Sequence, residues 1–218
     1  MSIFTYKAFN DKRDKVFLAV VLSAFALYIA FSCVYFASAA KTVRDDVVRL
    51  HILANSDSEE DQAVKLKVRD ALLKKNTVLL SDGVNTENAM LYFEKSKAEL
   101  QKTAEETLKE NGYDYGVEIS LGKEFYTTRQ YGELTFPAGE YTSLKVVLGE
   151  GEGHNWWCVM FPPLCVPAVD SVKGDSDKAE EYLSKSGNEI VGNGKKYIAK
   201  FKFLEIYEEL KKEFSERR

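Results

Sequence analysis

The sequence predicts an α+β fold, a largely antiparallel sheet with helices packed on one face, preceded by an N-terminal signal or transmembrane helix. Two observations lead to this prediction. The first is a long uncharged run within the first forty residues, and the second is a change of hydrophobic period from helical to alternating near residue 112. We therefore expect residues 1–40 to form a signal peptide or membrane anchor and residues 41–218 to form a single domain.

The uncharged run is Val16–Ala37, and basic residues precede it at positions 7, 12, 13 and 15. As a helix it would be about 33 Å long, against about 30 Å for the hydrocarbon core of a bilayer. The basic flank predicts a cytoplasmic N-terminus and an exported domain. Ala37-Ser38-Ala39 fits signal-peptide cleavage, but the run is longer than the apolar part of most signal peptides. Cleavage and permanent anchoring therefore both stay open.

Two helices are expected before the change of period. Ser58 and Asp61 form a capping box at the start of a helix over residues 59–75. A second amphipathic helix covers residues 86–111, where large apolar residues recur at helical spacing until an Asn-Gly pair stops them.

Two segments read as buried strands. Val47–Leu53 is β-branched and apolar, which indicates burial on both faces, provided that Arg49 and His51 lie near its ends or find partners. On a strand, residues 155–161 would present apolar side chains on both faces, which favours a central strand over an edge strand.

Residues 113–121 alternate between apolar and polar side chains, which is typical of a half-buried strand. Gly122-Lys123 is expected to turn the chain into a second strand over residues 125–131. A turn at residues 136–139 then leads into a third strand over residues 141–148.

The C-terminal part is expected to contain a short helix near residues 177–186. Gly192-Asn193-Gly194 predicts a hairpin, with residues 197–203 as its second strand. A C-terminal amphipathic helix follows, defined by Ile206, Leu210 and Phe214.

Charge and motifs exclude several classes of ligand. The formal net charge of -4 and the lack of a dense basic run argue against nucleic acid. Gly149-x-Gly151-x-Gly153 lacks the spacing of a dinucleotide loop and reads as a flexible turn. Acids at positions 57, 59 and 61 resemble a calcium loop, but residues 62 and 68 break that pattern. We therefore expect no cofactor and no metal.

The histidines and cysteines of the exported part are His51, His154, Cys158 and Cys165. Their number suits a zinc site, but on an extended chain His154 and Cys158 would be about 13 Å apart, too far to share one ion. No orienting residue or oxyanion site supports a cysteine protease. A Cys158–Cys165 disulfide across the two prolines, or two separate buried thiols, are the alternatives.

Trp156 and Trp157 are adjacent, so on a strand their side chains point to opposite faces. One is expected to pack in the core, and the other to cover a helix or to meet a partner protein.

Two blocks of the sequence resemble the stage II sporulation protein R family. The first is Arg49–Ser58 with the charged helix after it, and the second runs from Phe136-Pro137-Ala138-Gly139 through Asn155-Trp156-Trp157-Cys158 to Cys165. The resemblance implies a protein made in the forespore and exported into the space between the two membranes around it. There the family signals to a membrane-embedded aspartic protease of the mother cell, which cleaves the precursor of the early mother-cell sigma factor. It implies no catalytic residues.

We therefore expect a protein ligand, not an enzyme, whose surface docks on that receptor protease. The candidate contact residues are Trp156, Trp157, Phe161, Asn155, His51 and Asp57. The membrane is a second partner if the N-terminal segment is not cleaved. A cell-envelope thiol hydrolase that uses Cys158 or Cys165, and a tethered structural module, are the alternative hypotheses.

Overall fold

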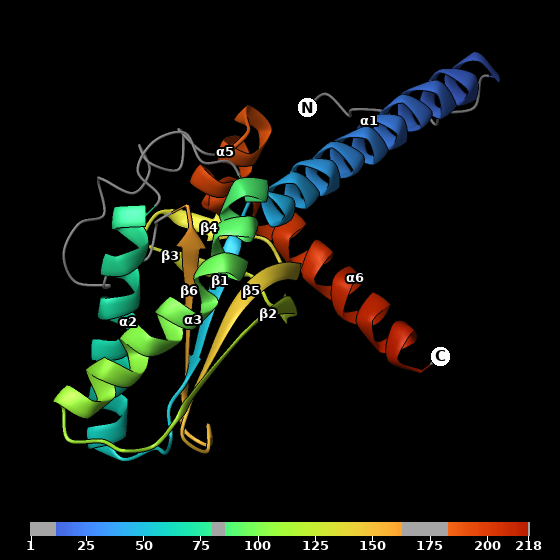
Figure 1. Cartoon of the computed structure of the whole chain (residues 1–218). Helices are drawn as coiled ribbons and strands as arrows, with labels where there is room; N and C mark the ends of the chain where they lie inside the picture. Colours follow the sequence, from blue (N-terminus) through green and yellow to red (C-terminus); the bar gives the residue numbers. More distant parts are fainter. Residues whose placement is uncertain (1–11, 80–85, 163–182, 218) are drawn as a thin grey trace, which may run out of the picture. The chain divides into compact units, whose positions relative to one another are not determined.

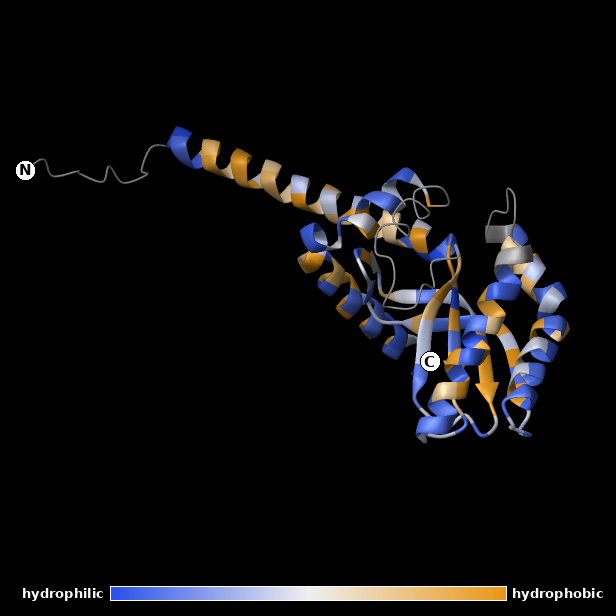
Figure 2. Cartoon of the chain, turned by 90° about the vertical axis from the view of Figure 1, so that its left-hand side faces the viewer, coloured by the Kyte–Doolittle hydropathy of each residue, from blue (hydrophilic) through white to orange (hydrophobic). Residues whose placement is uncertain are grey.

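The computed structural model describes residues 12–79, 86–162 and 183–217. The chain divides into two compact units, Met1–Ser38 and Ala39–Arg218. The first unit contains most of α1 (Lys12–Asp45), a helix long and apolar enough to cross a membrane. Figure 2 shows the run of hydrophobic residues along this helix. The predicted N-terminal apolar helix is confirmed, and its length and composition suit a signal sequence or a membrane anchor.

The second unit is built on a four-stranded sheet in the order β2-β5-β1-β6. Its strands are β1 (Val48–Leu53), β2 (Val117–Tyr126), β5 (Gly139–Leu148) and β6 (Asn155–Phe161). β1 and β5 are parallel, whereas β2 with β5 and β1 with β6 are antiparallel. The α+β fold with a largely antiparallel sheet is therefore confirmed, with one parallel pair at its centre.

Helices α2 (Glu59–Leu79) and α3 (Thr86–Glu110) pack on one face of this sheet (Figure 1). Because side chains alternate along a strand, Leu50 and Ile52 of β1 point toward the helices while Arg49 and His51 point to the other face. Burying each large apolar side chain contributes about 1.5–3 kcal/mol. The core between the helices and the sheet includes Val64, Val68, Leu72, Phe93, Leu100, Leu108, Leu144, Val146 and Met160.

The remaining described elements are β3 (Arg129–Tyr131), β4 (Leu134–Phe136), α5 (Lys185–Gly192), the 3-10 turn η1 (Gly194–Tyr197) and α6 (Ile198–Glu216). β3 and β4 form a small hairpin. α5 and η1 contact β4, and α6 contacts β5. The C-terminal elements therefore pack on the small hairpin and on β5.

The predicted hairpin at residues 192–194 is wrong, because this segment links α5 to η1 and α6. Gly194 is explained by packing, since a Cβ there would lie 2.0 Å from Thr135 Oγ1. Phe201 is 3% exposed and Phe203 is 67% exposed, although a strand would place both on one face. Most of the short helix expected near 177–186 lies outside the described residues.

Two further strand predictions are also corrected. Gly122-Lys123 is not a turn, because β2 continues to Tyr126 and both residues pair with β5. β6 lies at the edge of the sheet in the described part of the chain, not at its centre. Both of its faces are apolar because α2 covers one and a group of aromatic rings covers the other.

Candidate functional site

The two tryptophans of β6 lie on opposite faces of the sheet, as predicted from their adjacent positions. Trp156 faces the helices, and the guanidinium carbon of Arg69 on α2 lies 4.5 Å from the centre of its ring. Trp157 faces the other way, where its ring stacks on the imidazole of His51 with a centroid distance of 3.6 Å. Both residues are partly buried.

The side chain of His51 on β1 is buried, and both of its ring nitrogens have polar partners. Its Nδ1 lies 2.7 Å from Glu124 Oε1, its Nε2 lies 2.8 Å from Asn155 Oδ1, and the residue is 4% exposed. Burial alone would raise the pKa of Glu124, but hydrogen bonds from His51 and Ser143 outweigh it and hold that pKa below its ordinary value. Both ring nitrogens are therefore engaged by side chains of this domain, and the contact at Nε2 positions Asn155.

Arg49 lies beside His51 on the same face and is 1% exposed. Its Nη2 donates a hydrogen bond to the hydroxyl of Tyr131 at 2.7 Å, and four aromatic rings surround the guanidinium. The rings have their centres 4.5–5.5 Å from the guanidinium carbon and belong to Tyr126, Tyr131, Phe136 and Tyr141. We call Arg49, His51, Trp157 and these four residues the aromatic cluster.

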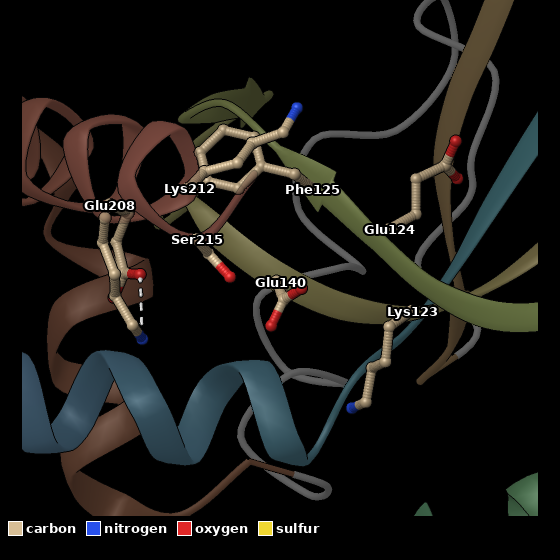
Figure 3. A pocket seen from close by; sticks show the side chains of 8 residues that line it. Lys123, Glu124, Phe125, Glu140, Glu208, Lys212 and Ser215 are labelled. Carbon is tan, nitrogen blue, oxygen red and sulfur yellow. Dashed lines mark ion pairs between the residues drawn. The ribbon is translucent and has the colours of Figure 1, made fainter. Parts of the chain in front are cut away.

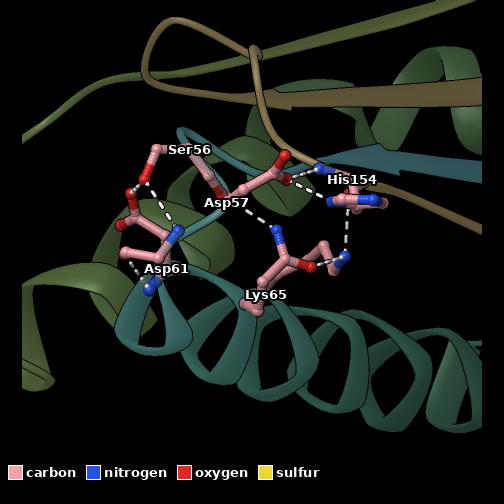
Figure 4. A network of polar contacts seen from close by, with 7 residues as sticks. Ser56, Asp57, Asp61, Lys65 and His154 are labelled. Carbon is pink, nitrogen blue, oxygen red and sulfur yellow. Dashed lines mark hydrogen bonds and ion pairs between the residues drawn. The ribbon is translucent and has the colours of Figure 1, made fainter.

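A second group of polar residues lies at the other end of β1, in the loop to α2 (Figure 4). The carboxylate of Asp61 accepts hydrogen bonds from Asn55 Nδ2 at 2.9 Å, Ser56 Oγ at 2.6 Å and the Tyr115 hydroxyl at 2.9 Å. Burial alone would raise the pKa of Asp61, but the hydrogen bonds from Ser56, Asn55 and Tyr115 together lower it.

This group also holds the loop between β5 and β6. Asp57 Oδ1 accepts from the backbone N–H of His154 at 2.6 Å and contacts His154 Nδ1, and these hydrogen bonds lower the pKa of Asp57. Lys65 Nζ donates to the carbonyl of His154 at 2.8 Å. We call Asn55, Ser56, Asp57, Asp61, Lys65, Tyr115 and His154 the loop network. Its role is to join the β1–α2 loop to the β5–β6 loop.

The predicted site residues differ in accessibility. Phe161 is 2% exposed and belongs to the core, so its ring is not presented at the surface. Asp57 and Asn155 are exposed, and Asp57 accepts a hydrogen bond from the backbone of His154, the residue before Asn155. Cys158 is 3% exposed and disulfide-bonded, whereas Cys165 lies outside the described residues, so the predicted pairing stays a prediction.

A separate cavity of about 400 Å³ lies between β2, β5 and α6 (Figure 3). Its walls carry acidic and basic groups in equal number, Glu124, Glu140 and Glu208 with Lys123, Lys211 and Lys212, together with Phe125 and Ser215. The charges are partly satisfied internally, since Lys211 pairs with Glu208 and Lys212 lies over the ring of Phe125. None of the predicted site residues lines this cavity.

Sequence reasoning missed several residues of the two groups, among them Tyr115 and Tyr126, and also Glu124, the partner of His51. One signal was available, because Arg49 and His51 are two positions apart and so share one face of a strand. Two polar side chains on one face of a buried strand require a set of partners from neighbouring elements.

The fold defines the class of protein, a compact α+β domain that follows a helix suited to a signal sequence or membrane anchor. The family model of stage II sporulation protein R matches residues 44–171, which is more than half of the chain. The chain therefore belongs to the stage II sporulation protein R family, as the sequence blocks predicted.

A curated relative supports this assignment. Stage II sporulation protein R of Bacillus subtilis (strain 168) is 38% identical over 139 residues. The match covers 64% of this chain and 61% of the relative, so the chain spans less than two thirds of that protein's length. No solved structure matches the chain.

Proposed function

We propose that this protein is an exported signal of sporulation. It is made in the forespore, crosses the forespore membrane, and activates a membrane-embedded aspartic protease of the mother cell. The protease then cleaves the precursor of the early mother-cell sigma factor. Membership of the stage II sporulation protein R family is the observation that carries this proposal. The N-terminal apolar helix supports export, because it supplies the segment that a translocated protein needs.

The contact with the protease is proposed to lie at the edge of the sheet where β6 begins. Asp57 and Asn155 are exposed there, and Trp156 and Trp157, which are partly exposed, follow Asn155 on the two faces of β6. His51 of the aromatic cluster contacts Asn155, and Asp57 of the loop network accepts a hydrogen bond from the backbone of His154, so both groups hold this edge in place. A rigid, partly apolar surface with polar groups at its rim is what a protein–protein contact requires.

Binding without catalysis accounts for the described groups better than a thiol hydrolase does. A hydrolase would need an accessible thiolate beside a base. Cys158 is buried and disulfide-bonded, and both nitrogens of His51 are engaged. The domain is therefore proposed to act by shifting the conformation of its receptor.

Complementation in sporulating cells tests this proposal. In a strain that lacks its own family member, forespore expression of the full chain should restore cleavage of the sigma-factor precursor, measured by immunoblot. A chain without residues 1–38 should fail, because it stays in the forespore cytoplasm. Failure of the full chain, when it is folded and exported, would overturn the proposal.

A matched pair of variants tests the surface. Asn155→Ala should reduce precursor cleavage at least about tenfold, the effect of losing about 1.4 kcal/mol of binding at a central contact. Asn193→Ala removes another exposed asparagine far along the chain and should leave cleavage unchanged. Thermal unfolding of both variants separates loss of binding from loss of folding. Equal cleavage by the two folded variants would remove this surface from the proposal.

A further inference from the structure

Helix α6 presents a stripe of large apolar side chains to solvent. Phe203, Ile206, Tyr207, Leu210 and Phe214 are 49–69% exposed, and each has another member of the set three or four positions away. This spacing places them on one side of a helix. The opposite side of α6 packs on the domain through Phe201, Leu204 and Glu208. We call the five exposed residues the α6 stripe.

The stripe is not explained by the fold of the second unit. Single exposed apolar residues are common, but five on one helix face form a contiguous surface that marks an interaction site. A stable contact between two protein copies needs about 20–30 residues on each side, far more than the stripe supplies. A lipid surface requires only one amphipathic helix with its apolar side chains in the headgroup region.

The chain itself brings α6 to a membrane. Glu208, in the middle of α6, pairs with Arg44 at 3.2 Å, and Arg44 also donates to the carbonyl of Ala138 at 3.0 Å. Both partners of this ion pair are about one-tenth exposed, so it is an internal tie of the second unit. Arg44 follows Ala37, the last residue of the apolar run, by only seven positions. Seven residues span at most about 25 Å even when fully extended.

The distance limit holds for every orientation of the two units. While the apolar run stays in a bilayer, the centre of α6 cannot lie far from the headgroups. Lys200 and Lys211 border the stripe on one side, and Lys202 lies with Glu209 and Glu213 on the other, given the rotation of about 100° per residue in a helix. Lys211 also pairs with Glu208, and Lys202 with Glu205. Lysines at such borders extend their ammonium groups to lipid phosphates while their methylenes cover apolar surface.

We propose that α6 is an interfacial helix, and that the α6 stripe docks on the lipid surface of the bilayer that holds α1. The domain would then touch the membrane at two places, the end of α1 and α6, which restricts its rotation about the anchor. This inference does not depend on the receptor, and it concerns residues beyond the matched family region.

Depth-dependent fluorescence quenching tests this docking. The full chain carries Cys33→Ser and one bimane label, either at Leu210→Cys in the stripe or at Glu209→Cys beside it, and is reconstituted in phosphatidylethanolamine–phosphatidylglycerol vesicles. Brominated acyl chains should quench the label at position 210 several-fold more than the label at 209. Aqueous iodide should show the opposite order. Equal quenching at both positions by either agent would overturn the proposal.

Two controls keep the result specific. Ile206→Ser with Phe214→Ser should abolish lipid quenching of the label at position 210, because the stripe is broken. Leu91→Ser, which changes a leucine of α3 that is 54% exposed, should leave it unchanged. Leu91, Ile206, Leu210 and Phe214 are all exposed, so the thermal midpoint should stay constant. Energy transfer between labelled copies without lipid quenching would show a second copy on the stripe and would also overturn the proposal.

Discussion

The side chain of Arg49 is buried without an acidic partner among the described residues. Its Nε and Nη1 atoms have no hydrogen-bond partner in that part of the chain, and its contacts are the Tyr131 hydroxyl and four aromatic rings. Each cation–π contact contributes about 0.5–2 kcal/mol, whereas removing an ion from water costs several kcal/mol. Arg49 therefore fills space between the rings at little net gain in stability.

Two substitutions at Arg49 distinguish its volume from its charge. Arg49→Met keeps most of the volume and removes the desolvation cost, so the free energy of unfolding should stay within about 1 kcal/mol of the original. Arg49→Ala leaves a cavity among the rings and should lose about 2–5 kcal/mol. Chemical denaturation measures both values. Equal losses for Met and Ala would show that the charge itself is needed.

Asp61 makes stability depend on pH. Its folded pKa lies below the unfolded value of about 3.9, because hydrogen bonds from Ser56, Asn55 and Tyr115 favour the carboxylate. The stabilisation is therefore fully present above the unfolded pKa and is lost as pH falls through the folded pKa. Asp61→Asn should flatten this acidic part of the stability curve, measured by denaturation between about pH 5 and pH 2.

Asp114→Asn is the matched control, because this aspartate is exposed and precedes β2 outside the loop network. Asp114→Asn should leave the pH dependence of the free energy of unfolding unchanged. A curve that keeps its full slope in Asp61→Asn would contradict the assigned hydrogen bonds.

At the scale of elements, the β5–β6 loop is positioned by close backbone contact. A Cβ on Gly153 would lie 2.1 Å from the backbone oxygen of Ser56, and a Cβ on Gly149 would lie 2.1 Å from Asn55 Oδ1. The backbone N–H of Gly153 also donates to the carbonyl of Ala54 at 2.9 Å. The glycines expected to form a flexible turn thus allow two loops to touch.

Gly153→Ala should destabilise the domain by about 1–3 kcal/mol, the usual cost of forcing an extra atom into a packed contact. It should also weaken protection of the β5–β6 loop from hydrogen exchange. Gly116→Ala provides the comparison, because nothing lies within 4 Å of a Cβ there. If both alanines cost the same, the close approach at Ser56 does not constrain the loop.

Most elements could be predicted from periodicity, but those near the C-terminus could not. α2 and α3 have apolar residues at helical spacing, and the valines and leucines of β5 indicate a strand. Around residues 192–203, Gly-Asn-Gly and an accidental alternation resembled a hairpin. The buried positions there, Phe201 and Leu204, are three apart, and only the contacts with the domain show which apolar residues point inward.

At the scale of the whole molecule, the sequence indicated which two segments carry the candidate site. It did not indicate which residues from other strands pack around them. Asp57 and Asn155 were expected near one surface, and the hydrogen bond between Asp57 and His154 joins the two segments next to the β1–β6 pairing. Glu124 and Tyr115 come from β2 and the segment before it, and no local pattern links them to His51 or Asp61. Long-range strand pairing decides such contacts, so the sequence order alone does not contain them.

The central claim is that the exported domain activates a membrane protease by binding. The most direct test reconstitutes the full chain and the receptor protease in liposomes and follows cleavage of the sigma-factor precursor. We predict that cleavage requires the chain and persists when Cys158→Ser and Cys165→Ser are combined, at a temperature where this variant is folded. No stimulation by the folded chain, or stimulation that is lost with the two cysteines, would contradict the claim.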